Sequence, residues 1–148
     1  MKNILTLIAT LLILSCSQQT KNIPQEFIGS WEYDIESVYK EIDEIFTSDE
    51  EKKSMKLAFV DIEKGKLCTV SKKGKLTYPE LSGDVYIQLS LVSKTNDGYI
   101  FSEKNSLNKE VTEYSLNTFE NGIWKSVLLD KEFKRLYPKL PNTYWKKK

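Results

Sequence analysis

Apolar and polar residues alternate along several short stretches of this chain. The clearest stretch is 85–91, where every second residue is Val, Ile or Leu and the residues between them are mostly polar. A second runs from Gly29 to Ile35, with Trp31 and Tyr33 in phase. A period of two is typical of a half-buried β-strand. The pattern predicts about eight strands, at 29–35, 66–72, 75–79, 85–94, 98–104, 109–118, 122–129 and 132–138.

The segments between these strands are short and carry turn residues. Lys73-Gly74, Asn96-Asp97-Gly98 and Asn121-Gly122 each separate two strands, and Asn-Gly is a strong hairpin signal. We therefore predict an antiparallel meander of about eight strands. Closure into a barrel would remove the unpaired edge strands. An open, curved sheet wrapped on helices is the alternative.

Residues 36–65 follow a different period. Val38, Ile42 and Ile45 or Phe46 recur at spacings of three and four, which predicts an amphipathic helix. Ser48 with Glu51 forms a capping-box pattern, and Gly65 can end a second helix. The sequence thus predicts a helix-turn-helix inserted after the first strand, although the branched and aromatic residues in 57–62 also fit the start of a strand.

The first residues have the parts of a secretory signal: the basic Lys2, an apolar run from Ile4 to Leu14, and a small residue before Cys16. Eleven helical residues span only about 16 Å, too short for a hydrocarbon core of about 30 Å. Residues 13–16, Ile-Leu-Ser-Cys, resemble the bacterial lipobox. That resemblance implies a signal peptide at 1–15, lipidation of Cys16 and a flexible tether at 16–25, with the folded domain at 26–148. By resemblance to the same class, Ser17 implies an outer-membrane lipoprotein that faces the periplasm.

Composition excludes several function classes. The chain has no histidine, which removes the commonest general base and zinc ligand. Once Cys16 is lipidated, Cys68 is the remaining thiol, and its alternating position predicts a small buried residue. Cleavage removes Lys2 from the 22 basic residues, so 21 basic residues balance the 21 acidic residues of the mature chain. A chain without excess positive charge is not expected to bind nucleic acid. We expect no enzyme activity, no cofactor and no metal site.

The segment Phe27-Ile28-Gly29-Ser30-Trp31 resembles the F-x-G-x-W entry into the first strand of lipocalins and fatty-acid-binding proteins, the calycins. Calycins bring a late arginine back to this tryptophan, and Arg135 is the only arginine in the chain. The resemblance implies a lipocalin-like barrel in which Arg135, on the predicted strand 132–138, covers Trp31. Fatty-acid-binding proteins also carry two helices after the first strand and a terminal R-x-Y, here Arg135-Leu136-Tyr137. In that family these two side chains hold a ligand carboxylate.

These features lead to one main functional expectation and one rival. We expect a membrane-anchored, non-enzymatic, lipocalin-like lipoprotein that binds a small apolar or carboxylate-bearing ligand, with Arg135, Tyr137 and Trp31 as candidate ligand-binding residues. In the structural alternative, Arg135 simply clamps Trp31 and plugs the barrel end. The rival is a protein-interaction module, such as an inhibitor, immunity protein or envelope accessory protein, with a solid barrel. The lysine-rich tail after Tyr144 fits either contact with an anionic membrane or a packed or frayed terminus.

Overall fold

A computed structural model describes residues 22–148 except 64, 83 and 109–110. The predicted signal peptide, Cys16 and the first part of the predicted tether lie outside the described residues. The described elements are η1 Gln25–Phe27, β1 Gly29–Tyr33, α2 Ile35–Ile45, α3 Asp49–Glu63, β2 Leu67–Val70, β3 Lys75–Thr77, β4 Tyr86–Thr95, β5 Gly98–Asn105, β6 Glu113–Glu120, β7 Ile123–Leu128, α4 Lys131–Leu136 and β8 Thr143–Lys147.

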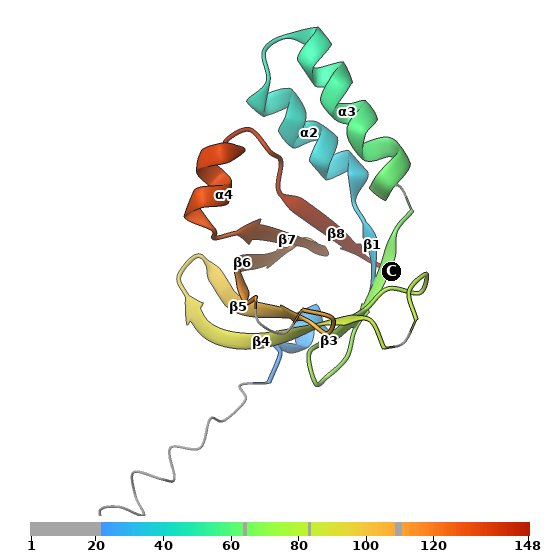
Figure 1. Cartoon of the computed structure of the whole chain (residues 1–148), viewed down its shortest axis with the longest axis vertical. Helices are drawn as coiled ribbons and strands as arrows, with labels where there is room; N and C mark the ends of the chain where they lie inside the picture. The colour runs from blue at the N-terminus through green and yellow to red at the C-terminus, as the bar shows by residue number, and fades with distance from the viewer. Residues whose placement is uncertain (1–21, 64, 83, 109–110) are drawn as a thin grey trace, which may run out of the picture.

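The eight described strands form one closed barrel in which each strand pairs with its neighbour in the sequence. The last strand returns to the first: Trp31 pairs with Lys147 and Tyr33 with Trp145, again antiparallel. Figure 1 shows the strands as a ring, with the α2–α3 hairpin on one side of it and α4 close to the end of β7. The predicted mainly β fold with two helices after the first strand is confirmed, and closure rules out the open sheet.

One predicted strand is wrong. Most of residues 132–138 belong to the short helix α4, and the eighth strand is Thr143–Lys147, in the segment expected to be a tail. Asp130 caps the helix, because its Oδ1 accepts a hydrogen bond of 2.7 Å from the backbone N of Phe133. Asp is among the residues that best satisfy the exposed N–H groups of a first turn. The tail is packed, since Trp145 is 5% exposed.

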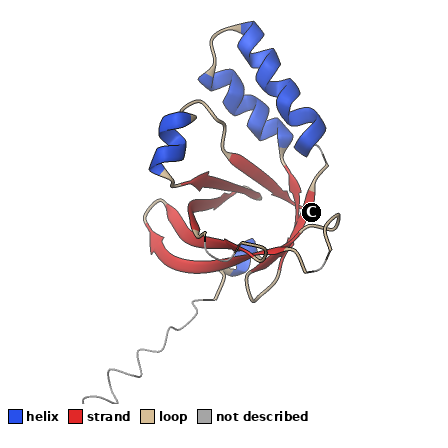
Figure 2. Ribbon diagram, in the orientation of Figure 1, coloured by secondary structure: helices blue, strands red, loops and turns tan. Residues whose placement is uncertain are grey.

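The inserted helices follow the predicted spacing. Val38 and Ile42 are buried, so α2 turns its apolar side to the core. The Ser48 hydroxyl accepts from the backbone N of Glu51 at 3.5 Å, as the capping pattern predicted. α3 continues to Glu63, which excludes a strand at 57–62, and Gly65 follows with a φ of 76°. Figure 2 shows the two helices as a hairpin beside the red barrel.

The strand register places one face of every strand inside the barrel. On β4, Leu89 is buried, and Ile87 and Leu91 are partly buried against the core, as the alternation predicted. Cys68 on β2 is also buried, which confirms its predicted place. Burial raises the pKa of the Cys68 thiol to about 12, so this side chain behaves as a small apolar residue.

Two turns need glycine for different reasons. In the β6–β7 hairpin, Asn121 and Gly122 have φ values of 51° and 81°, the positive pair that a tight two-residue turn requires. In the β2–β3 turn, a Cβ on Gly74 would clash with the carbonyl oxygen of Leu89. This close approach brings the turn against β4.

Candidate functional site

The barrel has two different ends, because antiparallel strands put successive connections at alternate ends. One end, which we name the closed end, carries η1 and the tight turns at 71–74, 96–97 and 121–122. The other, the mouth, carries the α2–α3 hairpin, the β3–β4 and β5–β6 connections, and the α4 segment between β7 and β8. The mouth therefore has the longer connections.

Aromatic side chains fill the closed end. Phe27 of η1, Trp31 of β1 and Phe101 of β5 have no exposed surface. The ring of Phe27 packs edge-on against Phe101 at 5.1 Å and against Trp124 at 5.5 Å, between ring centroids. The indole N–H of Trp31 donates to the carbonyl oxygen of Phe27 at 3.0 Å, so its polar atom is satisfied. Trp31 thus belongs to the packed plug of this end.

A lysine covers the plug from outside. Nζ of Lys147, on β8, lies 5.0 Å from the centre of the Trp31 ring. The same ammonium donates to the carbonyl oxygens of Glu26 and Ile28, each at 3.1 Å. A cation over an indole face is stabilising, and these two bonds tie the last strand to the segment that enters the first. Lys147 therefore holds the position over Trp31 that was predicted for Arg135.

Arg135 and Tyr137 are not paired on a barrel strand as the resemblance to calycins implied. Arg135 is exposed on α4, and Tyr137 follows the helix with 55% of its surface exposed. The prediction that they share a strand face fails because 132–138 is not a strand. Tyr137 still reaches a pocket at the mouth, which is described below, whereas Arg135 is not among the described residues that line it.

A chain of hydrogen bonds crosses the interior between the plug and the mouth. The indole N–H of Trp124 donates to Asn117 Oδ1 at 2.7 Å, and Asn117 Nδ2 donates to the Ser115 hydroxyl at 2.8 Å. The Ser115 hydroxyl in turn donates to a carboxylate oxygen of Glu103. Asn117 and Ser115 are buried, so the chain satisfies polar groups that would otherwise be costly inside the barrel.

Glu103 is the last residue of this series of hydrogen bonds and lies nearest to the mouth. Burial raises the pKa of its carboxyl group, the hydrogen bond from Ser115 opposes the rise, and the nearby charge of Glu113 adds to it. Glu103 and Glu113 are directly paired across β5 and β6. Two carboxyl groups thus share one side of the mouth.

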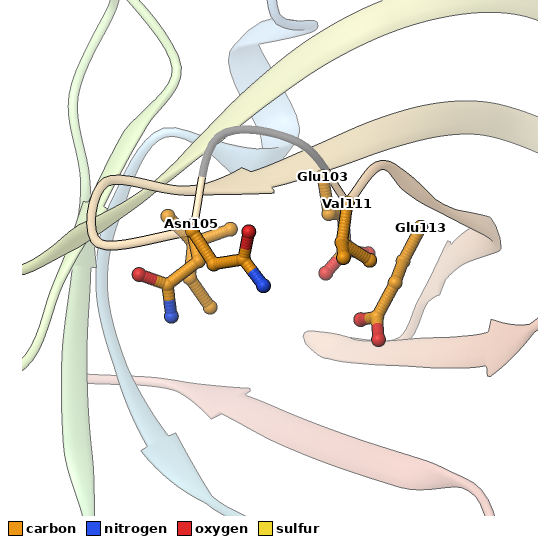
Figure 3. Close-up of a pocket in the computed structure, with 6 residues that line it drawn as sticks. Glu103, Asn105, Val111 and Glu113 are labelled. Atoms are coloured by element: carbon orange, nitrogen blue, oxygen red, sulfur yellow. The ribbon is translucent and has the colours of Figure 1, made fainter.

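An open pocket of about 250 Å³, the acidic mouth pocket, begins at this pair. Figure 3 shows the carboxyl groups of Glu103 and Glu113 with Asn105 and Val111 around it. Its lining residues come from β4, β5, β6 and the β5–β6 connection: Ile87, Glu103, Asn105, Asn108, Val111 and Glu113. The side chains offer mainly hydrogen-bond acceptors and amides, so this pocket does not suit an anionic group.

A second pocket, the α4 pocket, has about 220 Å³ between α4 and the start of β8. Its wall combines apolar side chains with Lys134, Tyr137 and small polar groups. Ser126 and Thr143, which are register partners, share the strand faces of the buried Trp124 and Trp145. The pocket therefore borders the barrel interior. Its lining residues are Ser126, Leu128, Phe133, Lys134, Tyr137, Leu140, Pro141, Asn142 and Thr143.

The wall of the α4 pocket is tied to α2. Both carboxylate oxygens of Glu41 accept from Asn142, one from its backbone N at 2.6 Å and one from its side-chain Nδ2 at 2.5 Å. The Glu41 side chain is only 14% exposed, and Nζ of Lys125 lies 3.9 Å from it. These charge-assisted bonds fix the segment between α4 and β8.

Large apolar side chains are exposed around the mouth. They lie on the β3–β4 connection, on the β5–β6 connection, and on or just after α4: Leu81, Leu107, Val111, Leu136, Tyr137 and Leu140, with exposed fractions of 43–75%. We name this set the apolar rim. Exposed apolar residues that gather near pockets are a common feature of binding surfaces.

Sequence reasoning missed the polar interior. On β6 the buried residues are Ser115 and Asn117. Tyr114, on the opposite face of the strand, is 48% exposed. Hydrophobicity alone therefore favours the wrong face of this strand. The predicted strand also gave no reason to expect Lys134 and Tyr137 in one pocket. Residues three positions apart lie on the same side of a helix such as α4, but on opposite faces of a strand.

Comparison with protein-family models, with curated proteins and with solved structures finds no match. Within the described part of the chain, no helix has the length and apolar character needed to cross a bilayer.

Proposed function

We propose that this chain is a lipid-anchored, lipocalin-like binding protein without enzymatic activity, which takes a small ligand with an apolar body and a carboxylate in the α4 pocket. The α4 pocket carries the proposal, since Leu128, Phe133 and Leu140 offer an apolar surface beside Lys134 and Tyr137. An ammonium group and a phenol hydroxyl are both hydrogen-bond donors suited to a carboxylate.

The size of the pocket limits the ligand. Sites for drug-sized molecules usually enclose roughly 300–1,000 Å³, whereas the α4 pocket has about 220 Å³ and is open to solvent. The aromatic rings of Phe27, Trp31 and Phe101 fill the closed end of the barrel and leave no room there for a ligand. The proposed ligand is therefore a short-chain or medium-chain acid rather than a long lipid held along the barrel axis.

The likeness to calycins supports a binding role. The closed antiparallel barrel, the G-x-W at the entry to β1 and a cationic side chain over that tryptophan agree with it, with Lys147 in place of the family's arginine. The α2–α3 hairpin after β1 agrees with the fatty-acid-binding proteins, but that family typically has ten strands. The terminal R-x-Y loses its weight as a carboxylate site, because it lies in and after a helix.

The proposed anchor rests on the resemblance of residues 13–16 to the lipobox. We propose that cleavage before Cys16 and its lipidation hold the protein on the outer membrane, facing the periplasm. Mass spectrometry of envelope-purified protein should find a mature chain that begins at Cys16 and carries acyl groups. A Cys16→Ser variant should lose them.

Ligand binding can be tested on protein purified in mild detergent from the bacterial envelope. Native mass spectrometry and solvent extraction should recover a small carboxylic acid at one per chain. With decanoate as the probe, Lys134→Ala and Tyr137→Phe should each weaken binding about tenfold, roughly the loss of one charge-assisted or neutral hydrogen bond.

Arg135→Ala is the matched control, because Arg135 is a cation on the same helix outside the α4 pocket. It should leave decanoate affinity within about twofold. Equal losses in all three variants would mean that α4 acts only through its stability or net charge. Failure of decanoate to bind the unaltered protein, together with an empty extract, would reject the ligand-binding proposal.

The apolar rim favours a second function, docking of a protein at the mouth. Partner surfaces are often centred on exposed apolar side chains of this kind. In that case Leu107→Ser and Leu136→Ser should abolish recovery of one stoichiometric partner from envelope extracts, while Lys134→Ala should retain it. If extracts yield no specific partner, this second function is rejected.

A further inference from the structure

The chain enters the barrel at the closed end, beside a pair of lysines. Ile23 is 5% exposed and packs at Gly74, so the start of the described chain is fixed against the β2–β3 turn. Asn22 and Ile23 border the same surface pocket as Lys72 and Lys73. Both lysines are exposed.

Charge is distributed unequally between the two ends. Exposed lysines at the closed end are Lys72, Lys73, Lys94, Lys147 and Lys148, against the acidic residues Glu26, Asp97 and Glu120. Lys94 is placed there by its contact with Tyr99, whose ring packs on Phe27. By contrast, the α2–α3 hairpin, residues 35–63, has nine acidic residues and four lysines, which outweigh the four cations and two acidic residues of the α4 segment, residues 130–142. The closed end is the more basic side of the domain.

The proposed anchor would hold this end close to the bilayer. Seven Cα–Cα steps separate Cys16 from Ile23, and at about 3.4 Å each they reach at most about 24 Å. A barrel tied at its closed end by so short a segment has that end nearest to the membrane. A tether of this length also lets the closed end approach the headgroups to within the Debye length of about 8 Å, where its lysines are attracted to anionic lipid.

We propose that the closed end of the barrel docks on an anionic phospholipid surface, with Lys72 and Lys73 as its main contacts, so that the mouth faces away from the membrane. The proposed orientation rests on the lipid anchor of the proposed function. The lysine contact itself can be tested without the anchor. A ligand or partner would then reach the mouth from the aqueous compartment and not from the bilayer.

The lysine contact is tested with mature protein, residues 16–148, carrying Cys16→Ser to remove the lipid. Its partition onto phosphatidylglycerol-containing vesicles and onto pure phosphatidylcholine vesicles is measured by co-sedimentation. Binding should require the anionic lipid and weaken with salt. The pair Lys72→Glu and Lys73→Glu should lower it at least tenfold, since each lysine near such a surface contributes about fivefold, or about 1 kcal/mol.

Lys52→Glu with Lys53→Glu is the matched control, an adjacent lysine pair with the same charge change on α3. It should leave partition within about twofold. Equal loss in both double variants, or equal binding to the two vesicle types, would overturn the lysine contact. Circular dichroism checks that each variant is folded.

The orientation is tested by hydrogen exchange of the lipidated protein in anionic vesicles and in detergent. Amides in the β2–β3 turn should exchange several-fold more slowly on vesicles, while those of α4 stay unchanged. Protection of α4, or of neither end, would overturn the orientation. Neither result bears on decanoate binding in the α4 pocket, so the docking surface and the proposed ligand function can fail independently.

Discussion

Lys147 and Trp31 illustrate how single residues close the barrel. The alternating pattern predicted Trp31 in the core, and the resemblance to calycins implied that Arg135 covers it; Trp31 is buried, but the cation over it is Lys147. A run of three lysines after Trp145 gives no sequence signal that one of them has a defined place. Its role comes from the pairing of β8 with β1, which places Lys147 opposite Trp31.

Replacement of Lys147 should therefore cost stability. Lys147→Ala removes two hydrogen bonds from a charged donor and a cation–π contact, and we expect a loss of about 1–2 kcal/mol at this solvent-facing site. Lys147→Arg should retain most of that stability. Urea unfolding followed by tryptophan fluorescence measures both. Lys146→Ala, at the next position of the strand, should cost under about 0.5 kcal/mol; a loss equal to that of Lys147→Ala would argue against a specific plug.

Glu103 makes stability depend on pH in a defined direction. Because burial raises its pKa in the folded protein, the folded state holds this proton more tightly than the unfolded chain does. Protonated Glu103 contributes to the free energy of unfolding. This contribution is fully present below the ordinary pKa of a glutamate and is lost as pH rises through the raised pKa. Glu103 thus opposes folding at neutral pH.

The variant Glu103→Gln removes that titration but still accepts a hydrogen bond from Ser115. Its midpoint of urea unfolding should fall less, or rise more, than that of the unaltered protein as pH goes from about 4 to about 7. Glu113→Gln should produce a smaller change of the same sign, since Glu113 only adds to the shift. An identical pH profile for Glu103→Gln and the unaltered protein would contradict the effect.

At the scale of elements, α4 shows why one strand was mispredicted. Phe133, Arg135 and Tyr137 alternate with other residues as a strand would, but Phe133, Leu136 and Tyr137 also have helical spacing. Six residues are too few for periodicity to decide between them. Asp130 before the run was the usable signal, because it is a helix cap in the structure. β6 was misleading for a different reason, since its buried face is polar.

Glu41 connects the inserted helices to the α4 pocket, and its removal should loosen both. Glu41→Ala should lower stability by about 2 kcal/mol, because it leaves the partly buried Asn142 without its charged acceptor. Hydrogen exchange at residues 137–142 should accelerate. Glu44→Ala, on the exposed part of α2, should do neither. Unchanged exchange at 137–142 would contradict the proposed tie.

At the scale of the whole molecule, closure of the barrel was predictable, but the difference between its closed end and its mouth was not. Alternation, turn residues and the cost of open edges were enough to predict a closed meander with a helical insertion. The filling of the closed end depends on Phe27 of η1, which packs against Phe101 and Trp124 and accepts the indole N–H of Trp31. That packing brings together residues far apart in the sequence, and single-sequence periodicity carries no information on it.

The two ends differ in their proposed roles: the closed, basic end faces the membrane, and the mouth, which faces away from it, holds the ligand site. The most direct test of the ligand site is an amide NMR titration of the chain from residue 16, carrying Cys16→Ser, with decanoate. Saturable shift changes should centre on Lys134, Tyr137 and Asn142 and leave the β2–β3 turn unchanged. Shift changes that are absent, or that centre on the closed end, would contradict ligand binding at the mouth.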